Sequence, residues 1–167
     1  MAQFELKPIS PAGVGVALQR AERYRLLNEP SLAESICLDV LRIEPENQRA
    51  LVTLLLAITD QFGNGASAAP ARELLPRLKS EYERRYFEGI VWERSAHAQL
   101  RSGISNAAAN TYARFLEAMR CYEDAIELRP AGNDDAILRW NTCARILMRH
   151  PDFEAQGDGA HMPSVRE

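Results

Sequence analysis

Apolar residues recur every three or four positions along most of this chain, and this spacing restricts it to a fold built from helices. Between Val14 and Arg149 the apolar positions fall on one face of each successive segment. No segment alternates apolar and polar residues in the way that a half-buried strand does. Proline or glycine follows most of the segments, and neither residue continues a helix readily. The sequence therefore predicts an all-α protein.

The stop signals divide the chain into expected helices of two lengths. Shorter helices are expected at 16–27, 31–43, 48–58 and 71–78, and longer ones at 82–101, 107–128 and 136–149. Ser31 and Ser105 stand where they would cap helices, and Pro76 is expected to interrupt the weakest helix. The segment 48–58 is apolar nearly all round, so we expect it to lie buried in the middle of the stack.

Length and composition fit one soluble domain. The chain has 167 residues, of which 46% are hydrophobic and 26% charged, as in ordinary globular proteins. The expected organisation is an N-terminal extension at 1–13, a helical domain at 14–149 and a flexible C-terminal tail at 150–167.

Charge and hydropathy indicate where the protein works and what it does not bind. The first residues lack the apolar core of a secretory signal, and no apolar run approaches the roughly 20 residues that span a bilayer. We therefore expect a cytoplasmic protein without a membrane partner. The net charge of −3 argues against broad nucleic-acid binding, which normally needs a basic surface.

Signs of catalytic chemistry are sparse. Cys37, Cys121 and Cys143 form no Cys-x-x-Cys pair, so we expect free and mostly buried thiols. Glu93 and His97 are four residues apart on one helix and could share a metal ion, but the other ligands of a two-metal site are missing from the sequence. The sequence predicts neither an enzyme nor a cofactor.

Small residues, aromatic residues and prolines stand at repeated distances in two parts of the chain, Ala21, Tyr24, Ala33 and Pro45 in the first and Ala118, Tyr122, Ala125 and Pro130 in the second. With these positions in its first and third repeats, the chain from about 14 to 149 resembles the tetratricopeptide repeat (TPR) family, in which small residues let paired helices approach closely. Trp92 and Trp140 each precede an alanine by four residues, which echoes the start of a repeat. Ala17 and Cys37 depart from the usual residues, and the spacing from Ala96 to Ala118 is too long by about ten residues.

The resemblance implies antiparallel helical hairpins stacked in a right-handed superhelix. About three repeats are expected, the third of them elongated, followed by a single C-terminal capping helix. In this family the first helix of each repeat lines a concave groove that holds a segment of another protein. The resemblance thus implies a protein–protein interaction module, an adaptor or assembly factor.

By the same analogy, two inner helices supply the partner-binding residues. The candidates are Arg94, His97 and Arg101 on one helix, facing Asn141, Arg145 and Arg149 on the next. Four arginines without as many acids would favour an acidic partner segment, because a guanidinium binds a carboxylate through two hydrogen bonds. A solvated basic face is the other interpretation of this pattern. The lysines and asparagines with which some TPR proteins bind chaperone tails are absent, so that partner is not expected.

Two other functions stay open on the sequence alone. In the first, the protein is a homo-oligomer or a structural subunit of a larger complex, with Tyr112, Phe115 and Leu116 in the interface. In the second, Glu93 and His97 form the centre of a metal-dependent enzyme. A ligand pocket lined by aromatic residues is expected only if those residues are not in the core, and at helical spacing a core position is the more common one. The residues concerned are Trp92, Tyr112, Phe115 and Trp140.

Overall fold

The structure is a computed structural model that describes residues 4–103 and 107–154, and within these ranges it is built from helices without a strand. The α-helices are α1 (Val14–Leu26), α2 (Pro30–Ile43), α3 (Gln48–Asp60), α4 (Ala69–Leu74), α5 (Glu81–Ser102), α6 (Ala107–Leu128) and α7 (Asp135–Arg149). Three short 3-10 helices join them: η1 (Pro11–Gly13), η2 (Phe62–Asn64) and η3 (Leu75–Arg77). The predicted all-α class is confirmed.

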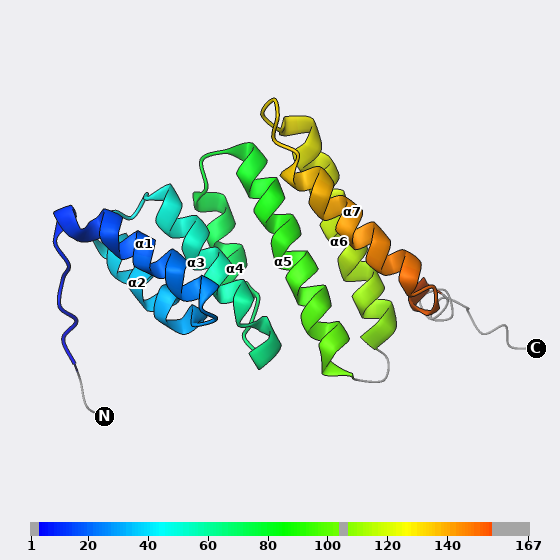
Figure 1. The fold of residues 1–167 in the computed structure, drawn as a ribbon, viewed down its shortest axis with the longest axis horizontal. Coiled ribbons are helices and arrows are strands. Elements are labelled where there is room, and N and C mark those ends of the chain that lie inside the picture. Colours follow the sequence, from blue (N-terminus) through cyan, green and yellow to red (C-terminus); the bar gives the residue numbers. More distant parts are fainter. Residues whose placement is uncertain (1–3, 104–106, 155–167) are drawn as a thin grey trace, which may run out of the picture.

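The helices lie side by side in chain order, with α1 at one end of the row and α6 and α7 at the other (Figure 1). Each helix packs against the next one along the chain. In addition, α1 contacts α3 and α3 contacts α5, so the first three odd-numbered helices form a continuous inner row. Charged residues of this row form the site described below.

The N-terminal helices α1 to α4 share an apolar core. Its centre is α3, which is buried on nearly every side, as its sequence predicts. Ala21 of α1 and Ala33 of α2 are completely buried in this core. Their small side chains allow the two helices to approach closely, which the sequence pattern also predicts.

The start of α2 differs from the prediction. The helix begins at Pro30 instead of being capped by Ser31, and no side chain caps it. Proline suits the first helical position because its φ angle is already helical and its missing N–H would have no partner there. Asn28 has a φ of 60°, and the next N–H, that of Glu29, donates to the carbonyl of Tyr24 at 2.8 Å. This turn connects α1 to α2 without a capping side chain.

Two caps were not anticipated from the sequence. The side chain of Asn47 accepts a hydrogen bond from the N–H of Ala50 at the start of α3, and Ser80 accepts one from Glu83 at the start of α5. The expected cap at Ser105 lies outside the described residues. Gly103, with a φ of 65°, ends α5 and is one of the glycines that the sequence predicts to follow a helix.

The interruption at Pro76 is confirmed, and it shortens the fourth helix. α4 has only six residues and passes directly into η3, which contains Pro76. α5 is much longer, with 22 residues. α4 is therefore too short to pack along the full length of α5, and an open cleft lies between α4, η3 and the first half of α5.

The long helices α5 and α6 are held together at a glycine that the sequence pattern did not single out. A Cβ atom placed on Gly89 would lie 2.5 Å from Cε1 of Tyr122. Only glycine allows the phenol ring to lie this close to the α5 backbone. Ala118 and Ala125 of α6 are also fully buried, at the positions that the family resemblance predicts to be small.

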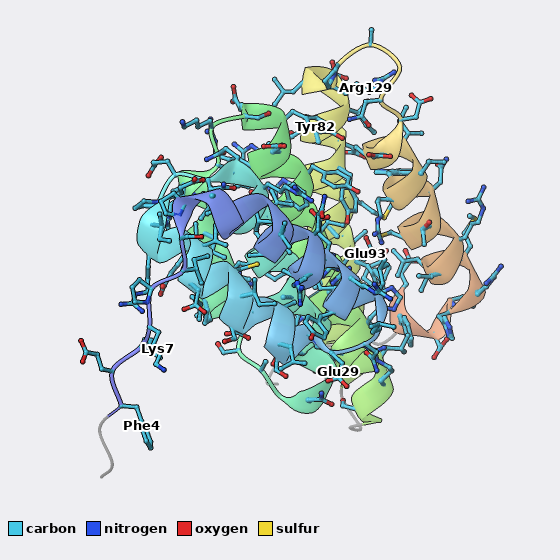
Figure 2. The ribbon with its side chains drawn as sticks, turned by 60° about the vertical axis from the view of Figure 1, so that its left-hand side comes forward. Phe4, Lys7, Glu29, Tyr82, Glu93 and Arg129 are labelled. Carbon is cyan, nitrogen blue, oxygen red and sulfur yellow. The ribbon has the colours of Figure 1, made fainter. Side chains whose placement is uncertain are left out.

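The described ends of the chain differ in their packing. Phe4 is exposed on an extended segment (Figure 2), as is Leu6, whereas Ile9 packs against the N-terminal core. At the other end Phe153 is buried and stacks on His150, with ring centroids 4.7 Å apart. Residues 150–153, expected at the start of a flexible tail, are thus packed, and residues 155–167 lie outside the described part. Among the described helices, none combines the length and the apolarity needed to cross a membrane.

Candidate partner-binding groove

A groove of about 350 Å³ crosses the inner row of helices and contains half of the predicted partner-binding residues. It is lined by Thr59, Asp60, Glu93, Arg94, His97, Arg101 and Arg139. Three of these, Arg94, His97 and Arg101, were predicted, and they come from one side of α5. Glu93 of α5, the end of α3 and one residue of α7 complete the lining.

The contribution of α7 differs from the prediction. Arg139 lines the groove, whereas Asn141, Arg145 and Arg149 are not among the described residues that do so. Six residues of α-helix rotate by about 240°, so Arg139 and Arg145 point in different directions. Arg145 and Arg149 are exposed on α7. The prediction that residues of two helices face each other across the groove is therefore right for the α5 residues and wrong for the α7 residues.

Arg94 is less available than the sequence suggested, because it is already paired. Its Nη1 donates to Oγ1 of Thr59 at 2.8 Å and to the carbonyl of Leu56 at 3.3 Å, and it forms an ion pair with Asp60. Asp60 also pairs with Arg25 of α1 at 2.7 Å. Burial lowers the pKa of Arg94, and the charge of Asp60 acts in the opposite direction. These contacts join α1, α3 and α5.

A second carboxylate, Glu93, is buried beneath the groove and joins the last three helices. Its side chain is 3% exposed, and it accepts hydrogen bonds from the hydroxyl of Tyr122 on α6 and, at 3.2 Å, from Arg139 on α7. Burial, reinforced by the charge of Glu93, raises the pKa of Tyr122, so its hydroxyl keeps the proton that it donates. The sequence had presented Glu93 as one half of an ordinary helix pair or a metal ligand.

His97 lies between this carboxylate and an aromatic ring. Its Nε2 is 3.8 Å from Oε1 of Glu93, and its ring meets that of Phe115 edge-on at 5.2 Å. Burial lowers the pKa of His97, and although Glu93 acts in the opposite direction, the nearby arginines add to the decrease. His97 is therefore neutral at neutral pH. Within the described ranges, no group of three or more His, Cys, Asp or Glu side chains is placed to hold a metal ion.

Arg101 is the exception among the groove arginines. It forms no ion pair with any residue that the structure describes, and its guanidinium lies beside η2, where a Cβ on Gly63 would be 3.6 Å from Nη2. Arg25, Arg94 and Arg139 each have a carboxylate partner, and Asp60 and Glu93 supply those partners. The lining has three arginines against two acids, and Arg25 adds a further positive charge beside Asp60, so the groove is positively charged with the surplus at the Arg101 end.

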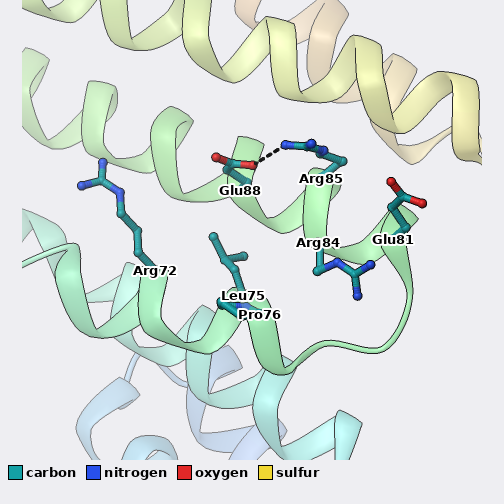
Figure 3. Close-up of a pocket in the computed structure, with 7 residues that line it drawn as sticks. All are labelled: Arg72, Leu75, Pro76, Glu81, Arg84, Arg85 and Glu88. Carbon is teal, nitrogen blue, oxygen red and sulfur yellow. Dashed lines mark hydrogen bonds and ion pairs between the residues drawn. The ribbon is translucent and has the colours of Figure 1, made fainter.

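A second hollow of about 570 Å³ lies between α4, η3 and the first half of α5 (Figure 3). Four of its five charged side chains contact a neighbour in the fold. Arg85 lies 3.3 Å from Glu88, Arg84 donates to the carbonyl of Leu78 at 2.6 Å, and Arg72 lies over the ring of Trp92 at 4.5 Å. Among the described residues Arg72 and Arg84 have no carboxylate partner and Glu81 has no partner, so this cleft presents charges of both signs, whereas the open charge of the inner groove is basic.

The remaining sequence candidates belong to the helix packing. Phe115 is fully buried, whereas Leu116 is 43% exposed. Trp140 packs against the C-terminal core and donates from Nε1 to Glu123 at 3.0 Å. The three cysteines are free and buried, and burial raises the pKa of each thiol to about 12. Thiolate chemistry at neutral pH is therefore suppressed.

Comparison with known proteins gave no relative of this chain. No family model, no curated protein and no solved structure matched it.

Proposed function

We propose that this protein is a tetratricopeptide-like interaction module that holds an acidic segment of a partner protein in its inner groove. The row of contacts from α1 to α3 to α5 supports this proposal, because repeat proteins of this kind stack their first helices in the same way. The buried alanines at positions 21, 33 and 118 support it too, since they stand where a TPR needs small residues.

The observation that carries the proposal is the unequal pairing of charges in the groove. Arg25 and Arg94 share Asp60, and Arg139 is held by Glu93, so these side chains are fixed before any ligand arrives. Arg101 has no such partner among the described residues. A carboxylate of a bound segment would be the partner of Arg101 and would accept charge-assisted hydrogen bonds from it, which are stronger than hydrogen bonds between neutral groups.

The side chains of the groove lose little conformational entropy when a partner segment binds. The charged groups of the groove are held by ion pairs that cross from one helix to the next, so binding does not have to order them again. The bound segment has to order only itself and Arg101. We therefore expect a short acidic segment to bind with an affinity that decreases as salt is added.

Charge reversal at Arg101 tests the proposal. The Arg101→Glu variant should capture the native partner at least about tenfold more weakly than wild type, because an acidic residue would repel the incoming carboxylate. Arg145→Glu is the matched control, since Arg145 is also exposed but does not line the groove. Binding can be measured by titrating the partner, once it has been isolated with the wild-type protein.

Arg94 is unsuited to this test. A glutamate at position 94 would face Asp60 and lose the hydrogen bonds to Thr59 and Leu56, so the fold itself would weaken. Undiminished and salt-independent binding by Arg101→Glu would show that the partner binds elsewhere on the molecule. Equal losses in Arg101→Glu and Arg145→Glu would point to the overall charge instead of the groove.

A further inference from the structure

Two exposed helix faces at opposite ends of the molecule have the same residue spacing and opposite charge. On α1 and its C-cap the residues Val16, Arg20, Arg23 and Leu27 follow one another at intervals of four, three and four. All four are exposed. They therefore form one stripe along the helix, on the side opposite the core.

On α6 the residues Leu116, Arg120, Glu123 and Glu127 have the same intervals. They too are exposed, on the side opposite Ala118 and Ala125, which are buried. Both stripes have the geometry of a helix surface that another helix can contact along its length.

The charges of the two stripes are complementary. Arg20 and Arg23 form no ion pair with a described residue, and no acidic side chain belongs to their stripe. On α6, Arg120 is paired with Glu117 at 3.2 Å and neighbouring Asp124 with Arg85 at 3.9 Å, which leaves Glu123 and Glu127 without an ion-pair partner among the described residues. Opposite potentials of this kind favour association and fix its register.

Exposed apolar residues accompany both stripes. Val16 is 54% and Leu27 61% exposed on the α1 side, and Leu116 is 43% and Leu128 42% exposed on the α6 side. The residues before α1 add Phe4 and Leu6, which are also exposed. Apolar side chains that gather in this way on a surface are typical of interaction sites.

We propose that the α1 stripe of one copy of this chain docks on the α6 stripe of a second copy. The two arginines of an α1 stripe would repel those of another α1 stripe, so pairing with the acidic stripe is preferred. Because the two surfaces are different and lie at opposite ends of the row of helices, the contact is heterologous and copies add head to tail (Figure 1). No residue of the inner groove takes part, so the groove stays open in the assembly.

Two double variants and their mixture test this contact. Arg20→Glu with Arg23→Glu reverses the basic stripe, and Glu123→Gln with Glu127→Gln neutralises the acidic one, while the amide oxygen at position 123 can still accept the hydrogen bond of Trp140. Sedimentation velocity of the wild type should show an average mass that rises with protein concentration, and each double variant should stay monomeric. The association should weaken when salt is raised from 0.1 M to 0.5 M, where screening is stronger.

The mixture gives the sharpest result. The first variant keeps its acidic stripe and the second its basic stripe, so an equimolar mixture has one intact contact and should form a 1:1 heterodimer that grows no further. Arg145→Glu with Arg149→Glu changes the net charge as much as the first variant does and should still associate like the wild type. Circular dichroism melts establish that all variants are folded.

A wild type that stays monomeric at high concentration overturns the proposal, as does a mixture of the two variants without a heterodimer. Association that survives in both double variants overturns it too, because another surface would then join the copies. None of these results bears on partner binding by Arg101, which is measured separately.

Discussion

The two halves of the molecule solve the same packing problem with different chemistry. In the half formed by α1 to α4, the buried polar side chains are the hydroxyls Thr53 and Thr59, and the core is otherwise apolar. In the half formed by α5 to α7, the core contains the carboxylate of Glu93, hydrogen-bonded to Tyr122 and Arg139. Both halves stack helices through small residues, but only the second depends on a buried charge.

The difference shows what each kind of core requires. An apolar core is non-directional, and side chains of similar volume can replace one another at a modest energetic cost. A buried charge is stable only while its hydrogen-bond partners remain, because an unpaired charge loses its solvation without compensation. The C-terminal half should therefore be the less tolerant of substitution, and the experiments below test that expectation.

Removing the buried carboxylate should have the largest effect. Glu93→Ala should lower the free energy of unfolding by about 2–4 kcal/mol, because it leaves a cavity and strands the hydroxyl of Tyr122. Urea unfolding measures the loss. Glu22→Ala is the N-terminal counterpart, since Glu22 pairs with Arg49 in solvent, and it should cost a small fraction of that amount. Equal losses would remove the distinction between the halves.

Enlarging the small residues should have the next largest effect, and in both halves. Ala33→Leu in α2 and Ala118→Leu in α6 should each destabilise the protein by about 1–3 kcal/mol, because both positions are completely buried where helices meet. Thermal melts compare the two variants directly. If either melts like the wild type, the close helix approach at that position is not required.

Replacing a glycine by alanine within an α-helix should have opposite effects on stability in the two halves, at Gly89 of α5 and at Gly15 of α1. Gly89→Ala should destabilise by about 1–2 kcal/mol, since the gain in helix propensity only partly offsets the contact with Tyr122. Gly15→Ala in α1 should stabilise by a few tenths to about 1 kcal/mol, because no atom lies within 4 Å of its added Cβ. Chemical unfolding of both variants would show the two signs, and stabilisation by Gly89→Ala would contradict the close approach of α5 and α6.

His97 should make the C-terminal half the more sensitive to acid. Its pKa in the folded protein is lowered by burial, so below a pH of about 6.5 the unfolded chain takes up a proton first and stability falls with pH. Replacing it in His97→Gln should reduce the loss of stability between pH 7.5 and 5.5. An NMR titration of the His97 ring measures the pKa itself, and a value above 6.5 would reverse the sign.

Apolar spacing and prolines were enough to predict the helices, because these signals are local. They predicted the bounds of α1 and α3, and the break at Pro76, to within a few residues. The start of α2 was wrong by one residue because Pro30 and Ser31 are both suitable helix starts and the backbone turn at Asn28 decides between them.

The groove was predicted less well, because its residues depend on how each helix is rotated. The residues of α5 were found from the family resemblance, which their helical spacing supports. Asp60 and Arg139 were missed because each of them meets α5 only in the folded protein. One signal was available: Arg139 stands three residues after Ala136 and four before Cys143, and both of these are buried. A charged residue on a buried stripe needs a charged partner, and Glu93 is that partner.

The ion pairs of the inner row also affect how the molecule bends. Any deformation that widens the groove must pull Asp60 away from Arg25 and Arg94, and Arg139 away from Glu93. A deformation that narrows the groove leaves these pairs in contact. The groove should therefore resist opening more strongly than it resists closing around a bound segment. Added salt should make the groove easier to open, chiefly at the ion pairs that are exposed to solvent.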